Sequence, residues 1–183
     1  MLFRDDADLA VTASQLLFLR SARNAEVEVP KERIDAAMGY VRRSFNAEKG
    51  TFTYAIVIGQ DVTRAMAGAG IVSLAMGGEH DSQIARQAGD WLLSRDFDRY
   101  NQAPQYYDRY HYGVYYCSQA MFQLGGDYWS KFYPPLMKTL VEHQRPDGSW
   151  DRESASDGVY GNAYTTALAI LSLTPPYQIL PIY

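Results

Sequence analysis

Tyrosines are concentrated in one short stretch of this sequence, and this makes them the first candidates for chemistry. The chain has 15 Tyr among 183 residues, and six of them fall between positions 106 and 116. They are Tyr106, Tyr107, Tyr110, Tyr112, Tyr115 and Tyr116. Aromatic faces that line a cavity stabilise carbocations by cation–π attraction. The same rings could equally pack one helix against another, so the sequence leaves both interpretations open.

Candidates for proton transfer and metal binding are fewer. The three histidines, His80, His111 and His143, lack the spacing of metal ligands, so no metal and no cofactor is predicted. His111 follows Asp108 closely enough for the two to move a proton, although an exposed histidine at a helix start is the commoner arrangement. Asp108 and Asp157 could act on a carbohydrate if their carboxylates faced each other.

Composition and charge exclude several classes of protein. The net charge of −4, without a basic stripe, argues against a nucleic-acid partner. Cys117 is the only cysteine, so no internal disulfide is expected, and its position indicates a packed helix face. No apolar run reaches membrane-spanning length and no signal peptide is visible, which predicts a cytoplasmic location by default. Because Asp8 already stands at the head of a helix, we expect the chain to be part of a longer protein.

The elements that must position these side chains are mainly helices, because apolar residues recur with helical spacing along most of the chain. Asp6 or Asp8 is expected to cap the first helix, and Asp61 or Thr63 the third. Residues 51–58 are predicted to form either a short strand or an extended loop. The predicted helices span about 8–25, 30–45, 64–76, 82–95, 110–124, 129–144 and 162–173.

A tight turn at residues 144–150 closes one of these helices. Pro146 cannot continue a helix, and Asp147-Gly148 favours a turn in which glycine adopts a positive φ. Trp150 is expected to pack back against the preceding helix, and Gln144 to bond the carbonyls at that helix's end. Pro134 and Pro135 predict that this same helix has an irregular first turn or begins after the two prolines.

The helices fall into two alternating sets with a common period. Four stretches superpose: 11–19, 66–74, 116–124 and 165–173. Their last residues, Leu19, Leu74, Leu124 and Leu173, are separated by 55, 50 and 49 positions. The intervening helices align through Tyr40, Trp91 and Leu140, which indicates a repeat of about fifty residues. The first set is rich in small and apolar residues and the second in charge, so an inner and an outer layer are expected.

The stretch Gln144-Arg145-Pro146-Asp147-Gly148-Ser149-Trp150 resembles the QW repeat of squalene-hopene and oxidosqualene cyclases. Residues 59–64 and 158–173 resemble the starts of the matching helices in those cyclases and in protein prenyltransferase β subunits. The resemblance implies an all-α fold, an α/α toroid or partial toroid of about seven helices, formed by residues 1–183 as a single domain. It also implies that the open edges are covered by the rest of a parent chain or by another subunit, as in a homo-oligomer.

Carboxylates near the start of the chain acquire a candidate role from this resemblance. In the cyclases an Asp-x-Asp-Asp motif protonates an alkene or epoxide, which requires an acid kept protonated by an apolar cavity and neighbouring carboxylates. Asp6-Ala7-Asp8 is similar, with Leu9 in the place of the last Asp and Asp5 as a further carboxylate. Asp6 and Asp8 are therefore the candidate catalytic acids. The alternative is that aspartate is simply favoured at a helix N-terminus.

The resemblance further implies an isoprenoid or another apolar lipid as ligand, with peripheral membrane contact as a route to it. The substrate-binding candidates are Tyr112, Tyr115, Tyr116, Tyr160 and Tyr164. Prenyltransferases bind zinc through an Asp-x-Cys pair and a distant histidine, but here Tyr110 stands in the place of the cysteine and Asn162 in that of the histidine. Zinc is therefore not expected. The alternative function is a catalytically inactive repeat module that binds a protein or a lipid.

Overall fold

The computed structural model of the chain describes residues 7–56, 61–102, 107–154, 156–180 and 182. Helices dominate these residues, and the only β-structure among them is one pair of two-residue antiparallel strands. The all-α prediction is therefore confirmed. The α-helices of the described ranges are α1 (Leu9–Asn24), α2 (Lys31–Arg43), α3 (Arg64–Met76), α4 (Gln83–Leu93), α5 (Tyr110–Leu124), α6 (Gly126–Glu142) and α7 (Gly161–Leu173). The shorter elements are β1 (Phe45–Asn46), β2 (Thr51–Phe52), and the 3-10 helices η1 (Ser156–Tyr160) and η2 (Pro175–Tyr177).

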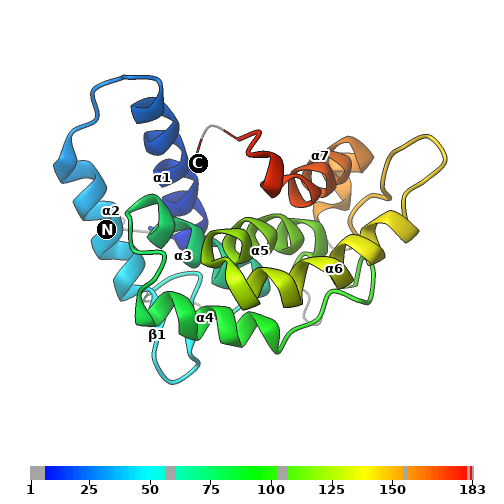
Figure 1. Cartoon of the computed structure of the whole chain (residues 1–183), viewed down its shortest axis with the longest axis horizontal. Helices are drawn as coiled ribbons and strands as arrows, with labels where there is room; N and C mark the ends of the chain where they lie inside the picture. Colours follow the sequence, from blue (N-terminus) through cyan, green and yellow to red (C-terminus); the bar gives the residue numbers. More distant parts are fainter. Residues whose placement is uncertain (1–6, 57–60, 103–106, 155, 181, 183) are drawn as a thin grey trace, which may run out of the picture.

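The helices form two layers that follow an arc (Figure 1). In the inner layer α3 packs against both α1 and α5, and α5 packs against α7. In the outer layer α2 packs on α1, α4 on α3 and α6 on α5. The alternation expected from the sequence is therefore present, and α1 and α7 stand at the two ends of the inner layer. The α/α toroid or partial toroid that the resemblance implies stays a prediction.

Burial separates the layers as their composition suggests. Every residue from Arg64 to Leu74 of α3 is buried, whereas only Met38 and Val41 of α2 are. Gly68 permits the close approach of α3 to α5, because a Cβ built there would lie 2.7 Å from the backbone nitrogen of Cys117. The small residues of the inner helices thus allow two helices to pack against one central helix.

Side-chain caps fix where three helices begin. Asp8 accepts the N–H of Val11 at 2.7 Å, at the start of α1. Thr63, and not Asp61, caps α3. Ser82 caps α4. Such caps satisfy backbone donors that have no partner within the helix. Asp6, the other candidate for the first cap, lies outside the described residues.

The turn after α6 confirms one expectation and corrects another. Trp150 packs back on α6, and its Nε1–H donates to the carbonyl of Leu140 at 2.7 Å. Gly148 has φ 83°, as the turn requires. Gln144, however, donates to the carbonyl of Gly148 at 2.9 Å and not to the end of the helix. Its amide therefore closes the turn itself.

The prediction for the prolines was wrong, because α6 runs without a break from Gly126 to Glu142 with Pro134 and Pro135 inside it. Interior proline costs about 3 kcal/mol in a helix, since it removes a backbone hydrogen bond. Here Phe132 and Leu136, within two residues of the proline pair, are buried against the core. Packing of α6 on the inner layer therefore outweighs the local preference.

Candidate functional site

The N-terminal ends of the inner helices meet around one cavity of about 390 Å³, which we call the helix-start pocket. Ala10 comes from α1, Met66 from α3 and Tyr112 from α5, while Asp157 lies in η1 just before α7. Because all these residues stand near helix starts, the inner helices point their N-terminal ends toward the same place. The pocket is lined by Ala10, Tyr54, Asp61, Thr63, Ala65, Met66, Tyr107, Arg109, Tyr112 and Asp157.

Three tyrosine hydroxyls donate to three aspartates in and around this pocket. Two of these pairs join segments that are far apart in the sequence, and the third joins η1 to the helix α7 that follows it. The pairs are Tyr54–Asp8 at 3.0 Å, Tyr107–Asp61 at 3.3 Å and Tyr164–Asp157 at 3.2 Å. Burial and the adjacent Asp157 carboxylate raise the pKa of Tyr164, which keeps its hydroxyl protonated and donating.

Negative charge exceeds positive charge at the pocket. Arg109 is the only basic residue of its lining within the described residues, and its Nε lies 2.6 Å from Oδ1 of Asp157. Asp61 lines the same cavity, and Asp8 contacts it through Tyr54. Ala10, Ala65 and Met66 supply apolar surface beneath these groups. A ligand would therefore meet an apolar floor, aromatic walls and a net negative rim.

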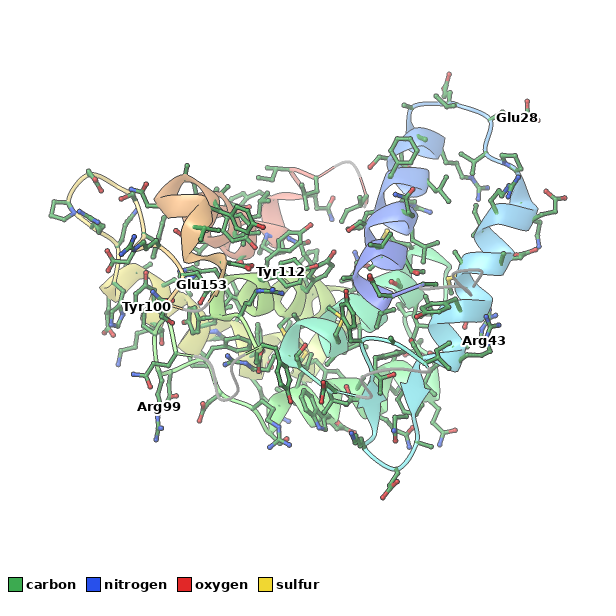
Figure 2. The ribbon with its side chains drawn as sticks, turned by 180° about the vertical axis from the view of Figure 1, so that it is seen from behind. Glu28, Arg43, Arg99, Tyr100, Tyr112 and Glu153 are labelled. Carbon is green, nitrogen blue, oxygen red and sulfur yellow. The ribbon has the colours of Figure 1, made fainter. Side chains whose placement is uncertain are left out.

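The tyrosines predicted to bind substrate divide into three groups: those that line the pocket, those that pack against other rings of α5, and those near η1. Tyr112 lines the pocket, and burial raises its pKa. Figure 2 shows it in the opening between α7 and α1. Tyr116 is only 3% exposed and packs edge-on against Tyr112 and Tyr115, at ring distances of 5.0 and 4.9 Å. Tyr160 is 64% exposed and lies against Tyr164. The cluster thus combines both predicted roles, pocket lining and helix packing.

The pairing of Asp108 with His111 is corrected by the structure. His111 is fully buried, and its Nδ1 lies 3.1 Å from Oε2 of Glu153. Oε1 and Oε2 of Glu153 also accept the backbone N–H groups of Tyr110 and His111, at 3.2 and 2.8 Å. Glu153 therefore caps α5, which has no cap from its own preceding residue. The expectation of an exposed histidine was also wrong, because the bonds to the distant Glu153 hold the start of α5 in the core.

Asp108 is bound instead by the buried Arg64. The Arg64 Nε donates to Oδ2 of Asp108 at 3.0 Å, and its other nitrogens donate to the carbonyls of Asp96 and Gln102. Burial raises the pKa of Asp108, although the Arg64 charge opposes this. Asp108 lines a different cavity from Asp157, so this predicted carboxylate pair does not share a pocket.

Asp61 is the pocket carboxylate that the sequence did not identify. It was considered only as an alternative cap for α3, a role that Thr63 takes. Its place in the same cavity as Asp157 depends on contacts between segments nearly a hundred residues apart. Nothing in the local pattern around Asp61 could therefore have indicated it.

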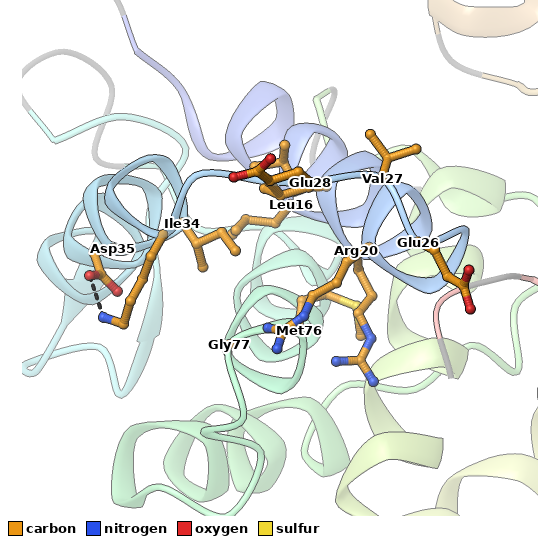
Figure 3. Close-up of a pocket in the computed structure, with 13 residues that line it drawn as sticks. Leu16, Arg20, Glu26, Val27, Glu28, Ile34, Asp35, Met76 and Gly77 are labelled. Atoms are coloured by element: carbon orange, nitrogen blue, oxygen red, sulfur yellow. Dashed lines mark hydrogen bonds and ion pairs between the residues drawn. The ribbon is translucent and has the colours of Figure 1, made fainter.

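A larger cavity lies elsewhere, between α1 and α2, with a volume of about 600 Å³ (Figure 3). Its walls combine aliphatic residues such as Leu16 and Ile34 with charges of both signs, among them Arg20 and Glu28. None of the predicted catalytic or substrate-binding residues lines it. Size alone therefore does not make it the better candidate.

Comparison of the chain with family models, with curated proteins and with solved structures gives no match. Within the described part of the chain, no helix is both long enough and apolar enough to span a membrane. Among the same residues, no three His, Cys, Asp or Glu side chains are grouped so that they could hold a metal ion.

Proposed function

We propose that the chain is a cyclase-like or prenyltransferase-like domain that handles an isoprenoid or another apolar lipid in the helix-start pocket. The observation that supports this most directly is one cavity lined by three tyrosines, two aspartates and an apolar floor. Its volume of about 390 Å³ lies in the range of small-molecule sites. The resemblance of residues 144–150 to a cyclase repeat points to the same class of ligand.

The lining suits a reaction in which positive charge develops on a hydrocarbon. Ala65 and Met66 contact the apolar chain, and the tyrosine rings attract a cation through their π faces. The carboxylates of Asp61 and Asp157 add a fixed negative potential at the same place. Asp8 is the candidate acid, adjacent to the pocket through its hydrogen bond with Tyr54.

Removing the ring of Tyr107 is expected to weaken binding of farnesol, used as a soluble probe, by about three- to tenfold, because apolar contact with a ring face contributes about 1 kcal/mol to holding such a ligand. Tyr107 is 44% exposed, so Tyr107→Leu should fold as the wild type does. Isothermal titration calorimetry measures the change, and Tyr107→Phe, which keeps the ring, is the matched control. Equal affinity of the leucine variant and the wild type would exclude this pocket as the binding site.

The substitution Asp8→Asn distinguishes a catalytic acid from a residue that only caps a helix. Asparagine caps a helix about as well as aspartate does, so we expect the free energy of unfolding to change by less than about 0.5 kcal/mol. Turnover of squalene and of shorter polyprenyl substrates, followed by product chromatography, should fall to background, because an amide cannot supply the proton. Turnover that survives the substitution would remove Asp8 as the acid. If the wild type binds these substrates without turnover, the chain is the binding module of the alternative hypothesis.

A carbohydrate ligand is the second candidate, favoured by the presence of Asp61 and Asp157 in one pocket. Glycoside hydrolysis uses two facing carboxylates, and tyrosine faces can stack on sugar rings. Both carboxylates, however, are already engaged here: Asp61 accepts a hydrogen bond from Tyr107, and Asp157 accepts one from Tyr164 and forms an ion pair with Arg109. Release of reducing ends from an oligosaccharide panel, abolished by Asp61→Asn, would select this candidate over the first.

A further inference from the structure

The two ends of the inner layer expose apolar surface that carries no charge. On α1, Val11 is 58% exposed and Phe18 64%. On α7, Ile170 is 44% exposed, and Ala163 and Ala167 are exposed as well. α7 has the same length as α3 and contains no charged residue, yet only three of its residues are buried. The helices α1 and α7 stand at the two ends of the arc (Figure 1), and each has exposed apolar residues.

The repeat register shows what normally covers the exposed side of α7. The third residue of each aligned stretch is small and lies against the next inner helix. At Gly68 a Cβ would meet the α5 backbone at Tyr116, at 2.7 Å. Ser118, its equivalent on α5, donates from its hydroxyl to the backbone of Ser172 on α7. Ala167 is the equivalent on α7, and it is exposed because no further inner helix follows among the described residues.

The same register explains the exposed side of α1. The first and eighth residues of each stretch lie on the side of the preceding inner helix, as the contacts made by Tyr116 and Ser172 show. On α3 these positions are Met66 and Ser73, which are 3% and 0% exposed. On α1 they are Val11 and Phe18. Here they face solvent, since the described part of the chain places no inner helix before α1.

These exposed faces differ from the exposed face at the start of the outer helix α2. The first turns of α2 present Lys31, Glu32, Arg33 and Asp35 to solvent. A solvated helix face is usually charged in this way. Exposed apolar residues that lie together on a helix face are typical of a surface that another protein covers.

We propose that α7 of one copy packs against α1 of a second copy, so that the contact between neighbouring inner helices continues across two chains. A second copy is the occupant that fits, because each chain carries both halves of this contact, the small residue at Ala167 and the apolar pair Val11 and Phe18. The contact joins two different surfaces and is therefore heterologous. It is independent of the ligand proposed for the helix-start pocket.

Two single substitutions test this contact, Phe18→Lys on α1 and Ala167→Lys on α7. The wild type should associate at micromolar concentrations in sedimentation velocity, whereas each variant alone should associate at least about tenfold more weakly, since a lysine must then be buried in the contact. An equimolar mixture of the two variants should restore a one-to-one dimer. In this mixture the intact α7 of the Phe18→Lys chain meets the intact α1 of the Ala167→Lys chain.

Val141→Lys is the matched control, because Val141 is 56% exposed but lies on the outer helix α6. It should associate as the wild type does, and thermal melting at concentrations too low for association should be unchanged in all three variants, since each replaces an exposed side chain. A wild type that stays monomeric up to about 100 µM overturns the proposal. Association that is lost in one variant and not restored by mixing indicates a contact between identical surfaces, and this also overturns it.

Discussion

Replacing Glu153 with glutamine is expected to lower the free energy of unfolding by about 3 kcal/mol, because it breaks a buried charged contact. The Glu153 carboxylate accepts two backbone N–H groups at the start of α5 and contacts Nδ1 of His111. An amide has only one accepting oxygen, so at least one buried donor loses its partner. Chemical denaturation measures the loss. Glu142→Gln, at an exposed ion pair on α6, is the control and should change stability by less than about 0.5 kcal/mol.

The stability lost in Glu153→Gln should depend on pH in a defined direction. Burial opposes the charged form of Glu153, but the bonds from His111 and Tyr110 outweigh it, so its pKa lies below the ordinary value of 4.5. A lowered pKa in the folded state stabilises the protein above pH 4.5, and this contribution disappears as the pH falls through the folded-state pKa. The difference between wild type and Glu153→Gln should therefore shrink in acid. A difference that grows as the pH falls would contradict the assignment.

Adding one methyl group at Gly68 is expected to destabilise the fold by about 3 kcal/mol, although alanine is ordinarily the better helix former. The new Cβ would lie 2.7 Å from backbone atoms of Tyr116 and Cys117, which cannot move aside as a flexible side chain can. α3 and α5 must then separate, although every residue of α3 from Arg64 to Leu74 is buried. The change is measured by the midpoint and slope of urea unfolding.

Gly39→Ala provides a control of opposite sign. Gly39 lies inside α2, and a Cβ there would meet only the end of the flexible Arg43 side chain, at 3.4 Å. Alanine should therefore raise the free energy of unfolding by about 1 kcal/mol, the ordinary difference between glycine and alanine in a helix. Destabilisation by both substitutions, or by neither, would show that close packing at Gly68 does not limit the approach of the helices.

Local patterns predicted the elements well and the contacts of the candidate site only in part. The bounds of α3 follow directly from the Thr63 cap, an apolar run and a glycine, which are all signals within one segment. Tyr112 was recognised as a candidate because the density of tyrosines is itself local. Pro134 misled the prediction for α6, since its local cost is outweighed by packing on helices from elsewhere in the chain.

The sequence by itself determined an all-α chain of repeated hairpins, with small residues marking one layer and charges the other. Helix propensity, caps and periodicity act over a few residues, so they can be read without coordinates. The partners of Asp61, Asp108 and Glu153 were settled only when the chain packed. Each of these carboxylates binds a residue more than forty positions away, and such contacts depend on how whole helices pack together.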